Sequence, residues 1–95
     1  MSNPPPILDG AKVLAFADLS EVEATGVVRH FRDGAFQESN GFAYLALAVY
    51  ERDIGCYAFY CDAQWEVQND LLFDSRHDAE LQLAREFQGL HFTDV

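Results

Sequence analysis

Residues 42–50 form an unbroken apolar run in which no alternate position is polar. A run of this kind predicts a β-strand that is covered on both faces. Residues 54–62 form a second strand-like segment, and Arg52 and Asp53 lie at the connection between the two. The pattern therefore predicts two adjacent central strands, at about 42–51 and 54–62.

Because side chains alternate along a strand, pairing Tyr50 near Gly55 divides this hairpin into two faces. One face is rich in aromatic residues and carries Tyr44, Ala46, Ala48, Tyr50, Tyr57, Phe59 and Cys61. The other face is more aliphatic and carries Leu45, Leu47, Val49, Cys56, Ala58 and Tyr60.

One helix is predicted after this hairpin, beginning at Asp74 or Ser75 and ending near Gln88. Asp78 gives the helix an acidic first turn, and Gly89 is a natural stop. The apolar stripe consists of Ala79, Leu83, Ala84, Phe87 and Leu90. A helix of this length spans about 20 Å, and five strands span about 24 Å, so the helix covers part of one face. The aromatic face is then covered by curling of the sheet, by the N-terminal segment, or by another molecule, in which case it is an interaction surface.

The remaining chain predicts shorter elements around this centre. Residues 1–9 contain three consecutive prolines and are expected to be a flexible tail before a single domain at 10–95. Further strands are expected at 12–19, 25–32, 35–38 and 65–69, with turns at 33–34, 39–41 and 62–64. Residues 20–25 fit either a short helical turn or a hairpin connection. Residues 90–95 fit either a short edge strand or a loose end.

The charge balance restricts the classes of partner. Sixteen acidic and six basic residues give a net charge of −10, which argues against binding to nucleic acid or to an anionic membrane. The acidity fits simple solubility, or an acidic surface that meets a basic partner. No signal-peptide pattern is visible at the N-terminus, and the longest apolar run is far shorter than the ~20 residues of a membrane span. We therefore expect a cytoplasmic protein.

Candidate chemistry is sparse. On one strand, Cys56 and Cys61 would point to opposite faces about 16 Å apart, so they cannot form a disulfide or share a metal ion. The histidines, His30, His77 and His91, show no metal-ligand spacing. A Cys61 thiolate is disfavoured by the adjacent Asp62. We therefore predict no catalytic residue, no cofactor and no metal site.

A set of residues between positions 57 and 87 resembles the sequence pattern of a group of proteins. The set is Tyr57, Ala58, Phe59, Tyr60, Cys61, Asp62, Trp65, Asp70, Asp74, Ser75, Ala79, Glu86 and Phe87. It is similar to short bacterial proteins of uncharacterised function that share a strand, a turn with Trp, a second strand and a helix. The resemblance covers residues 41–89 and implies no activity and no catalytic residue. Residues 70–73 depart from the Asp-Thr-Trp-His that those proteins tend to have.

We predict an α+β domain with an antiparallel sheet of about five strands and one C-terminal helix packed on one face. We expect the protein to be a non-enzymatic protein-interaction module that forms a homodimer or binds another protein. An immunity-like protein, which neutralises a bacterial toxin, is one specific form of this function. The expected partner-binding residues are Tyr44, Tyr50, Tyr57, Phe59 and Trp65, although Trp65 also fits a core position. The alternative is a small apolar ligand held near Tyr44, Tyr57, Phe59 and Trp65.

Overall fold

The computed structural model describes residues 3–20, 22–25, 29–32, 35–38 and 41–95, with the backbone alone at 29–32 and 35–38. The main sheet has the strand order β1-β2-β6-β7-β8, and β10 also pairs with β2. Its strands are β1 (Ile7–Leu8), β2 (Ala11–Asp18), β6 (Tyr44–Val49), β7 (Cys56–Cys61), β8 (Val67–Phe73) and β10 (Thr93–Asp94). All pairs in this sheet are antiparallel.

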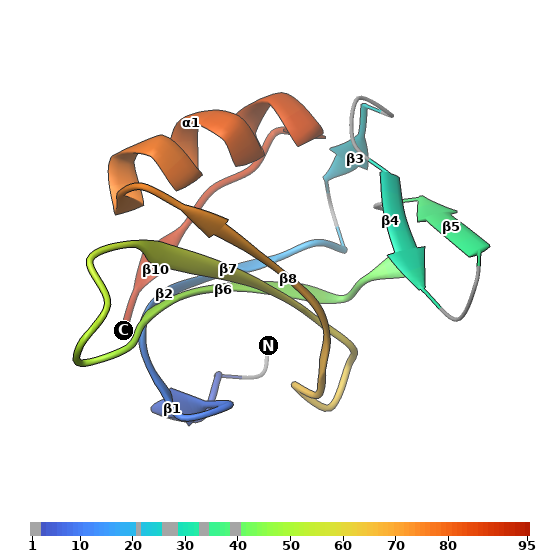
Figure 1. Cartoon of the computed structure of the whole chain (residues 1–95). Coiled ribbons are helices and arrows are strands. Elements are labelled where there is room, and N and C mark those ends of the chain that lie inside the picture. The colour runs from blue at the N-terminus through green and yellow to red at the C-terminus, as the bar shows by residue number, and fades with distance from the viewer. Residues whose placement is uncertain (1–2, 21, 26–28, 33–34, 39–40) are drawn as a thin grey trace.

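The other elements are one helix and two small strand pairs (Figure 1). They are β3 (Glu23–Ala24) with β9 (Phe87–Gln88), β4 (Arg29–Arg32) with β5 (Ala35–Glu38), and the helix α1 (Arg76–Glu86). The predicted α+β class, with an antiparallel sheet and a C-terminal helix, is confirmed. In the described part of the chain, no helix reaches the length and hydropathy that a membrane crossing requires.

The central hairpin has the predicted register, with Ala48 opposite Tyr57 and Tyr44 opposite Cys61. Its two faces belong to two separate buried clusters. The cluster on the aliphatic face, here called the Leu83 cluster, contains Ala15, Ala17, Leu19, Phe42, Leu45, Leu47, Cys56, Ala58, Tyr60, Ala79, Leu83 and Phe87. The cluster on the aromatic face, here called the Trp65 cluster, contains Leu8, Ala11, Val13, Phe16, Ala46, Ala48, Phe59, Cys61 and Trp65.

Curling of the sheet supplies much of the cover for the Trp65 cluster. The register of β2 against β6 shifts between Val13 and Ala15, and such a bulge bends a strand. The chain also reverses at Asp9 and Gly10, whose φ angles are 48° and 82°, and this turn pairs β1 with the start of β2. Figure 1 shows β1 on the side of the sheet away from α1. The first two strands therefore contribute Leu8, Val13 and Phe16 to the aromatic face.

Trp65 completes this cover from the turn between β7 and β8. Its φ angle of 64° is rare for a residue with a side chain and turns the chain back before β8 begins. The Asp62 carboxylate accepts from the backbone N–H groups of Gln64 and Glu66, both at 2.9 Å, and fixes this turn. The indole stacks on Tyr44, with ring centroids 4.2 Å apart, and meets Phe16 edge-on.

Several predicted boundaries were wrong. Ile7 and Leu8 are not part of a loose tail, because the Asp9–Gly10 turn pairs them with β2. Trp65 precedes its strand, and β8 continues to Phe73 because Leu71 and Phe73 pack against the Leu83 cluster. Of the two alternatives for residues 20–25, the helical turn does not form at 23–24, because these residues are extended and pair with β9. β5 pairs with β4 outside the main sheet. The predicted turns at 33–34 and 39–40 lie outside the described residues.

The helix begins and ends close to the predicted positions. Ser75 is the N-cap, and its hydroxyl accepts from the backbone N–H of Asp78 at 3.1 Å. Ala79, Leu83 and Phe87 from the predicted stripe are buried, whereas Ala84 is exposed. The helix stops at Glu86 because Phe87 is extended and pairs with Ala24. Residues 93–94 form the short edge strand that was one of the two alternatives.

Gly55 marks a close approach between the β6–β7 turn and the end of β8. A Cβ atom at this position would lie 2.6 Å from the carbonyl oxygen of Phe73 and 2.7 Å from a methyl group of Leu72. Both distances are shorter than van der Waals contact, so a larger residue requires the end of β8 to move.

Leu83→Ala is expected to lower the free energy of unfolding by about 2–5 kcal/mol, because Leu83 is fully buried in its cluster and the truncation leaves a cavity. Leu81→Ala on the exposed side of the same helix should change it by less than about 1 kcal/mol. Urea unfolding followed by circular dichroism measures both. Equal losses in the two variants would contradict the assignment of Leu83 to the core.

Candidate functional site

The five predicted partner-binding residues separate into two groups. Phe59 and Trp65 are only 1% and 7% exposed, so the single chain already buries them. Tyr44, Tyr50 and Tyr57 pack against the same cluster but remain half-buried. On this face, the three half-buried tyrosines are therefore the residues that can contact a partner. Their role in docking stays a prediction.

Tyr50 and Tyr57 form a pair at the end of the face near the β6–β7 turn. Their ring centroids are 5.2 Å apart and the rings are perpendicular, which is a favourable arrangement for two aromatic quadrupoles. The Tyr50 hydroxyl donates to the backbone carbonyl of Asp9 at 2.8 Å. This bond ties the end of β6 to the turn that leads into β2.

The charges of three aspartates act on Tyr50. Burial, followed by the negative charge of Asp9, the neighbouring Tyr57 and the negative charges of Asp70 and Asp53, raises the pKa of Tyr50. Asp53 lies in the turn after Tyr50 and donates its backbone N–H to the Tyr50 carbonyl at 3.2 Å. Asp70 lies on β8 opposite Phe59. All three aspartates are exposed to solvent.

Exposed apolar side chains adjoin the tyrosine pair. Leu72, which pairs with Tyr57 across the strands, is 59% exposed, and Ile54 in the turn is 98% exposed. We call Tyr50, Ile54, Tyr57 and Leu72 the tyrosine surface. It borders the outer edge of β8, which pairs with no strand among the described residues.

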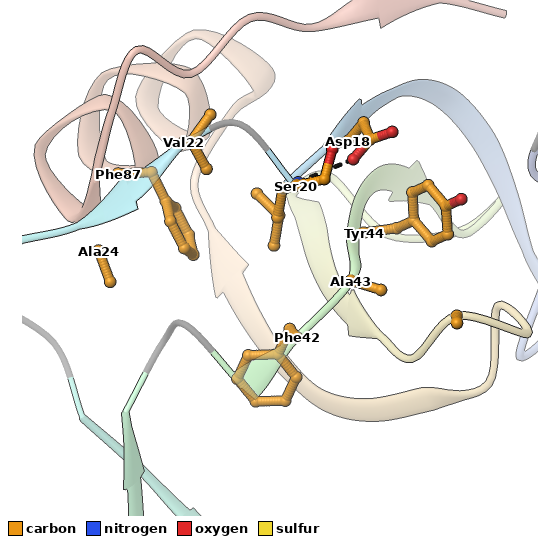
Figure 2. Close-up of a pocket in the computed structure, with 10 residues that line it drawn as sticks. Asp18, Ser20, Val22, Ala24, Phe42, Ala43, Tyr44 and Phe87 are labelled. Carbon is orange, nitrogen blue, oxygen red and sulfur yellow. Dashed lines mark hydrogen bonds between the residues drawn. The ribbon is translucent and has the colours of Figure 1, made fainter. Parts of the chain in front are cut away.

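A cavity of about 430 Å³ lies at the opposite end of the central hairpin (Figure 2). Its lining residues are Asp18, Leu19, Ser20, Val22, Ala24, Phe42, Ala43, Tyr44, Ala63 and Phe87. Figure 2 shows Phe42 and Phe87 toward one end of the space, and Asp18 and Tyr44 toward the other. The backbone N–H of Ser20 donates to the Asp18 carboxylate at 2.8 Å, and this bond lowers the pKa of Asp18.

This cavity does not coincide with the predicted ligand site. Of the four residues expected to hold an apolar ligand, Tyr44 alone lines it. Tyr57, Phe59 and Trp65 instead pack on the Trp65 cluster, where Tyr57 and Phe59 stack with centroids 5.9 Å apart. Sequence patterning missed the cavity because its walls come from four separate segments of the chain.

Glu86 is a buried acid beside Tyr60 of the Leu83 cluster, with only 1% of its surface exposed. The Tyr60 hydroxyl donates to its carboxylate. Burial, followed by this hydrogen bond and the carboxylate charge, strongly raises the pKa of Tyr60. The helix end is further fixed by Thr25, whose backbone N–H donates to the Glu86 carbonyl at 2.8 Å.

Sequence reasoning missed the Tyr60–Glu86 pair, although a signal was present. Glu86 follows Leu83 by three residues, which places it on the buried side of the helix. Tyr60 lies on the aliphatic face as predicted. A buried carboxylate needs a donor, and the tyrosine hydroxyl supplies one.

The thiols and histidines show no assembled reactive group. Cys56 and Cys61 are free and lie in different clusters, as their odd spacing predicts. Burial first, and then the charge of Asp62, raises the pKa of Cys61 to about 12, so this thiol is protonated at neutral pH. His77 and His91 are exposed, and the side chain of His30 lies outside the described residues. Across the described ranges, no three His, Cys, Asp or Glu residues gather to hold a metal ion.

Comparisons with protein-family models, with curated proteins and with solved structures each found no match. The resemblance to short bacterial proteins therefore stays a prediction from the sequence.

Tyr60→Phe is expected to reduce the free energy of unfolding by about 1–3 kcal/mol near neutral pH, because the buried Glu86 carboxylate loses a donor. The wild-type advantage should shrink as the pH rises above about 10, where Tyr60 ionises in the unfolded chain but stays protonated in the folded one. Urea titrations of both proteins between pH 7 and about 11 measure this difference. A gap that stays constant over this range would contradict the buried pair.

Proposed function

We propose that this chain is a non-enzymatic protein-interaction module that docks through the tyrosine surface. The observation that carries the proposal is the exposure of Leu72 and Ile54 beside a half-buried tyrosine pair. Exposed apolar and aromatic side chains that lie near one another mark interaction sites on small proteins. Aromatic rings also provide much of the binding energy in protein interfaces.

In this proposal, α1 covers only one face of the sheet. Ala79 and Leu83 of the helix belong to the Leu83 cluster and not to the Trp65 cluster. The aromatic face relies on β1, the start of β2 and the Trp65 turn for its cover. This cover does not reach the outer corner of the aromatic face, where β7 meets β8. Leu72 and Asp70 are exposed there.

Charge favours a different protein over a second copy as the partner. The negative charges of Asp9, Asp53 and Asp70 act on Tyr50. In a symmetric homodimer, the same patch on each subunit meets its counterpart, so these carboxylates would gather at one interface. Like charges brought together in this way weaken association. An immunity-like protein that covers a basic target in the cytoplasm is one version of this function.

The cavity between Phe42 and Phe87 supports a second candidate function, the binding of a small apolar molecule. Its volume falls in the range of natural ligand sites. Most of its lining residues are apolar, and three polar side chains, Asp18, Ser20 and Tyr44, lie among them. A ligand bound here would contact β2, β3 and β9, at a distance from the tyrosine surface.

Leu72→Ser is expected to weaken binding to the partner by at least about fivefold, because it removes the exposed large apolar side chain of β8 from the contact. Leu81→Ser is the matched control, since Leu81 is similarly exposed, at 52% against 59%, but lies on α1. A photo-crosslinking residue at position 54 should form a saturable covalent adduct with the partner protein. Added protein that lacks the crosslinking residue should compete for the partner and reduce the amount of adduct. Unlabelled Leu81→Ser should suppress it as well as the wild type, and Leu72→Ser should suppress it less.

Light scattering at two concentrations shows whether the partner is a second copy. A concentration-dependent mass that Leu72→Ser abolishes assigns the tyrosine surface to a homodimer. A monomer with a saturable adduct assigns it to another protein. A monomer that gives no saturable adduct contradicts the proposed function.

A further inference from the structure

We infer that the Asn69 side chain closes the outer edge of β8 to strand pairing with a second copy of this chain, and that the charge of Asp70 reinforces the closure. The inference goes beyond the proposed function, because it concerns the backbone of the edge strand and not the side chains of the tyrosine surface. It follows from three features at one place, namely a sheet edge, a side chain bonded to a backbone group of that edge, and a charge beside it.

The two edges of the main sheet differ in their cover. On one side, β1 and β10 both pair with β2. On the other side, β8 pairs with β7, and no further strand pairs with β8 within the residues that the structure describes. β8 is seven residues long, and an open edge on a strand of this length is a template for pairing with another chain.

The hydrogen bonds of β7 show which backbone groups of β8 point outward. The Cys61 carbonyl accepts from the backbone N–H of Ala43 at 2.9 Å, on the β6 side of β7. Every second residue of an antiparallel strand bonds to the same neighbour, so Phe59 also bonds toward β6. Its partner on β8 is Asp70, which therefore directs its N–H and C=O groups away from β7. Leu72, two residues further along, does the same.

Asn69 occupies one of these outward groups. The backbone N–H of Asp70 donates to the side-chain oxygen of Asn69 at 2.9 Å. A strand added at this edge would have to displace the amide before it could accept from the same N–H. The cap removes no bond from the ladder, because this N–H points away from β7. Asn69 thus satisfies an edge donor that another chain would otherwise use.

Asp70 adds an electrostatic barrier at the same point. Its side chain is exposed, and it is the single charged residue of β8. A symmetric antiparallel pairing centred on Asp70 or Leu71 would place the two Asp70 carboxylates opposite one another or on the next diagonal. Like charges at these positions weaken strand pairing. The rest of β8 is uncharged and includes the exposed Leu72, so this barrier protects a strand that would otherwise favour association.

Amide hydrogen exchange in dilute protein tests the cap. Asn69→Ala removes the acceptor, so the Asp70 amide should exchange about two- to tenfold faster than in the wild type, which corresponds to the loss of one ordinary hydrogen bond. Gln68→Ala is the control, because the Gln68 amide bonds to Asp62 and to the Glu66 carbonyl. It should leave exchange at Asp70 unchanged. Equal exchange in Asn69→Ala and the wild type would overturn the inference.

Self-association tests the closure. The double variant Asn69→Ala/Asp70→Asn, here called the open-edge variant, should associate about tenfold more tightly than the wild type, because both the cap and the charge are lost. Light scattering over a concentration series measures this change. The matched control is Gln68→Ala/Glu23→Gln, which alters the net charge equally, at an exposed residue of β3, and keeps the cap. It should associate as the wild type does.

Two further substitutions in the open-edge variant show whether the copies join through the backbone. Leu72→Pro removes an outward N–H without taking a bond from β7 and should abolish the added association. Leu72→Ser keeps that N–H and should preserve it. Amide exchange in the open-edge variant gives an independent measure, since the amides at positions 70 and 72 should become protected as the concentration rises. NMR shifts of the Leu83 cluster show whether each variant is folded.

The inference is overturned if the open-edge variant associates no more tightly than its matched control. It is also overturned if association brings no protection at positions 70 and 72. Loss of the added association with Leu72→Ser would overturn it as well, because the tyrosine surface would then hold the copies together. The proposed function is tested separately by the adduct at position 54, which forms through side chains and does not require an open edge.

Discussion

The structure depends on one constraint, which is that a sheet with two apolar faces must be covered twice by a short chain. Residues 44–49 are buried or half-buried along their whole length. Ala79 and Leu83 of the helix belong to one of the two buried clusters. On the other side, the chain uses a bulge in β2, a reversal at Asp9–Gly10 and a folded-back tryptophan. These three features cover the aromatic face in place of a second layer of secondary structure.

The division of the central hairpin was predictable from the sequence because it follows from alternation alone. Once Tyr50 pairs near Gly55, every side chain from Tyr44 to Cys61 is assigned to a face, and the two observed clusters agree with that assignment. The helix cap at Ser75 was predictable for a similar reason, since a hydroxyl before an acidic first turn is a local signal.

The cover of the aromatic face was harder to predict because it depends on backbone conformations that residue type does not favour. Trp65 has a positive φ, although residues with large side chains rarely do. β1 begins directly after three prolines, which suggested a tail. The effect of Asp9, Asp53 and Asp70 on Tyr50 likewise depends on how two turns and β8 are placed in space. The candidate site was thus predictable in its tyrosines and not in its charges.

The position of Trp65 gives the chain an internal optical probe. It is the sole tryptophan of the sequence, and its indole stacks on Tyr44 within one cluster while the helix packs in the other. Its intrinsic fluorescence therefore monitors the aromatic half of the molecule, whereas far-ultraviolet ellipticity at 222 nm is dominated by α1. Comparing the two signals during denaturation would reveal whether the halves melt as one cooperative unit or in succession.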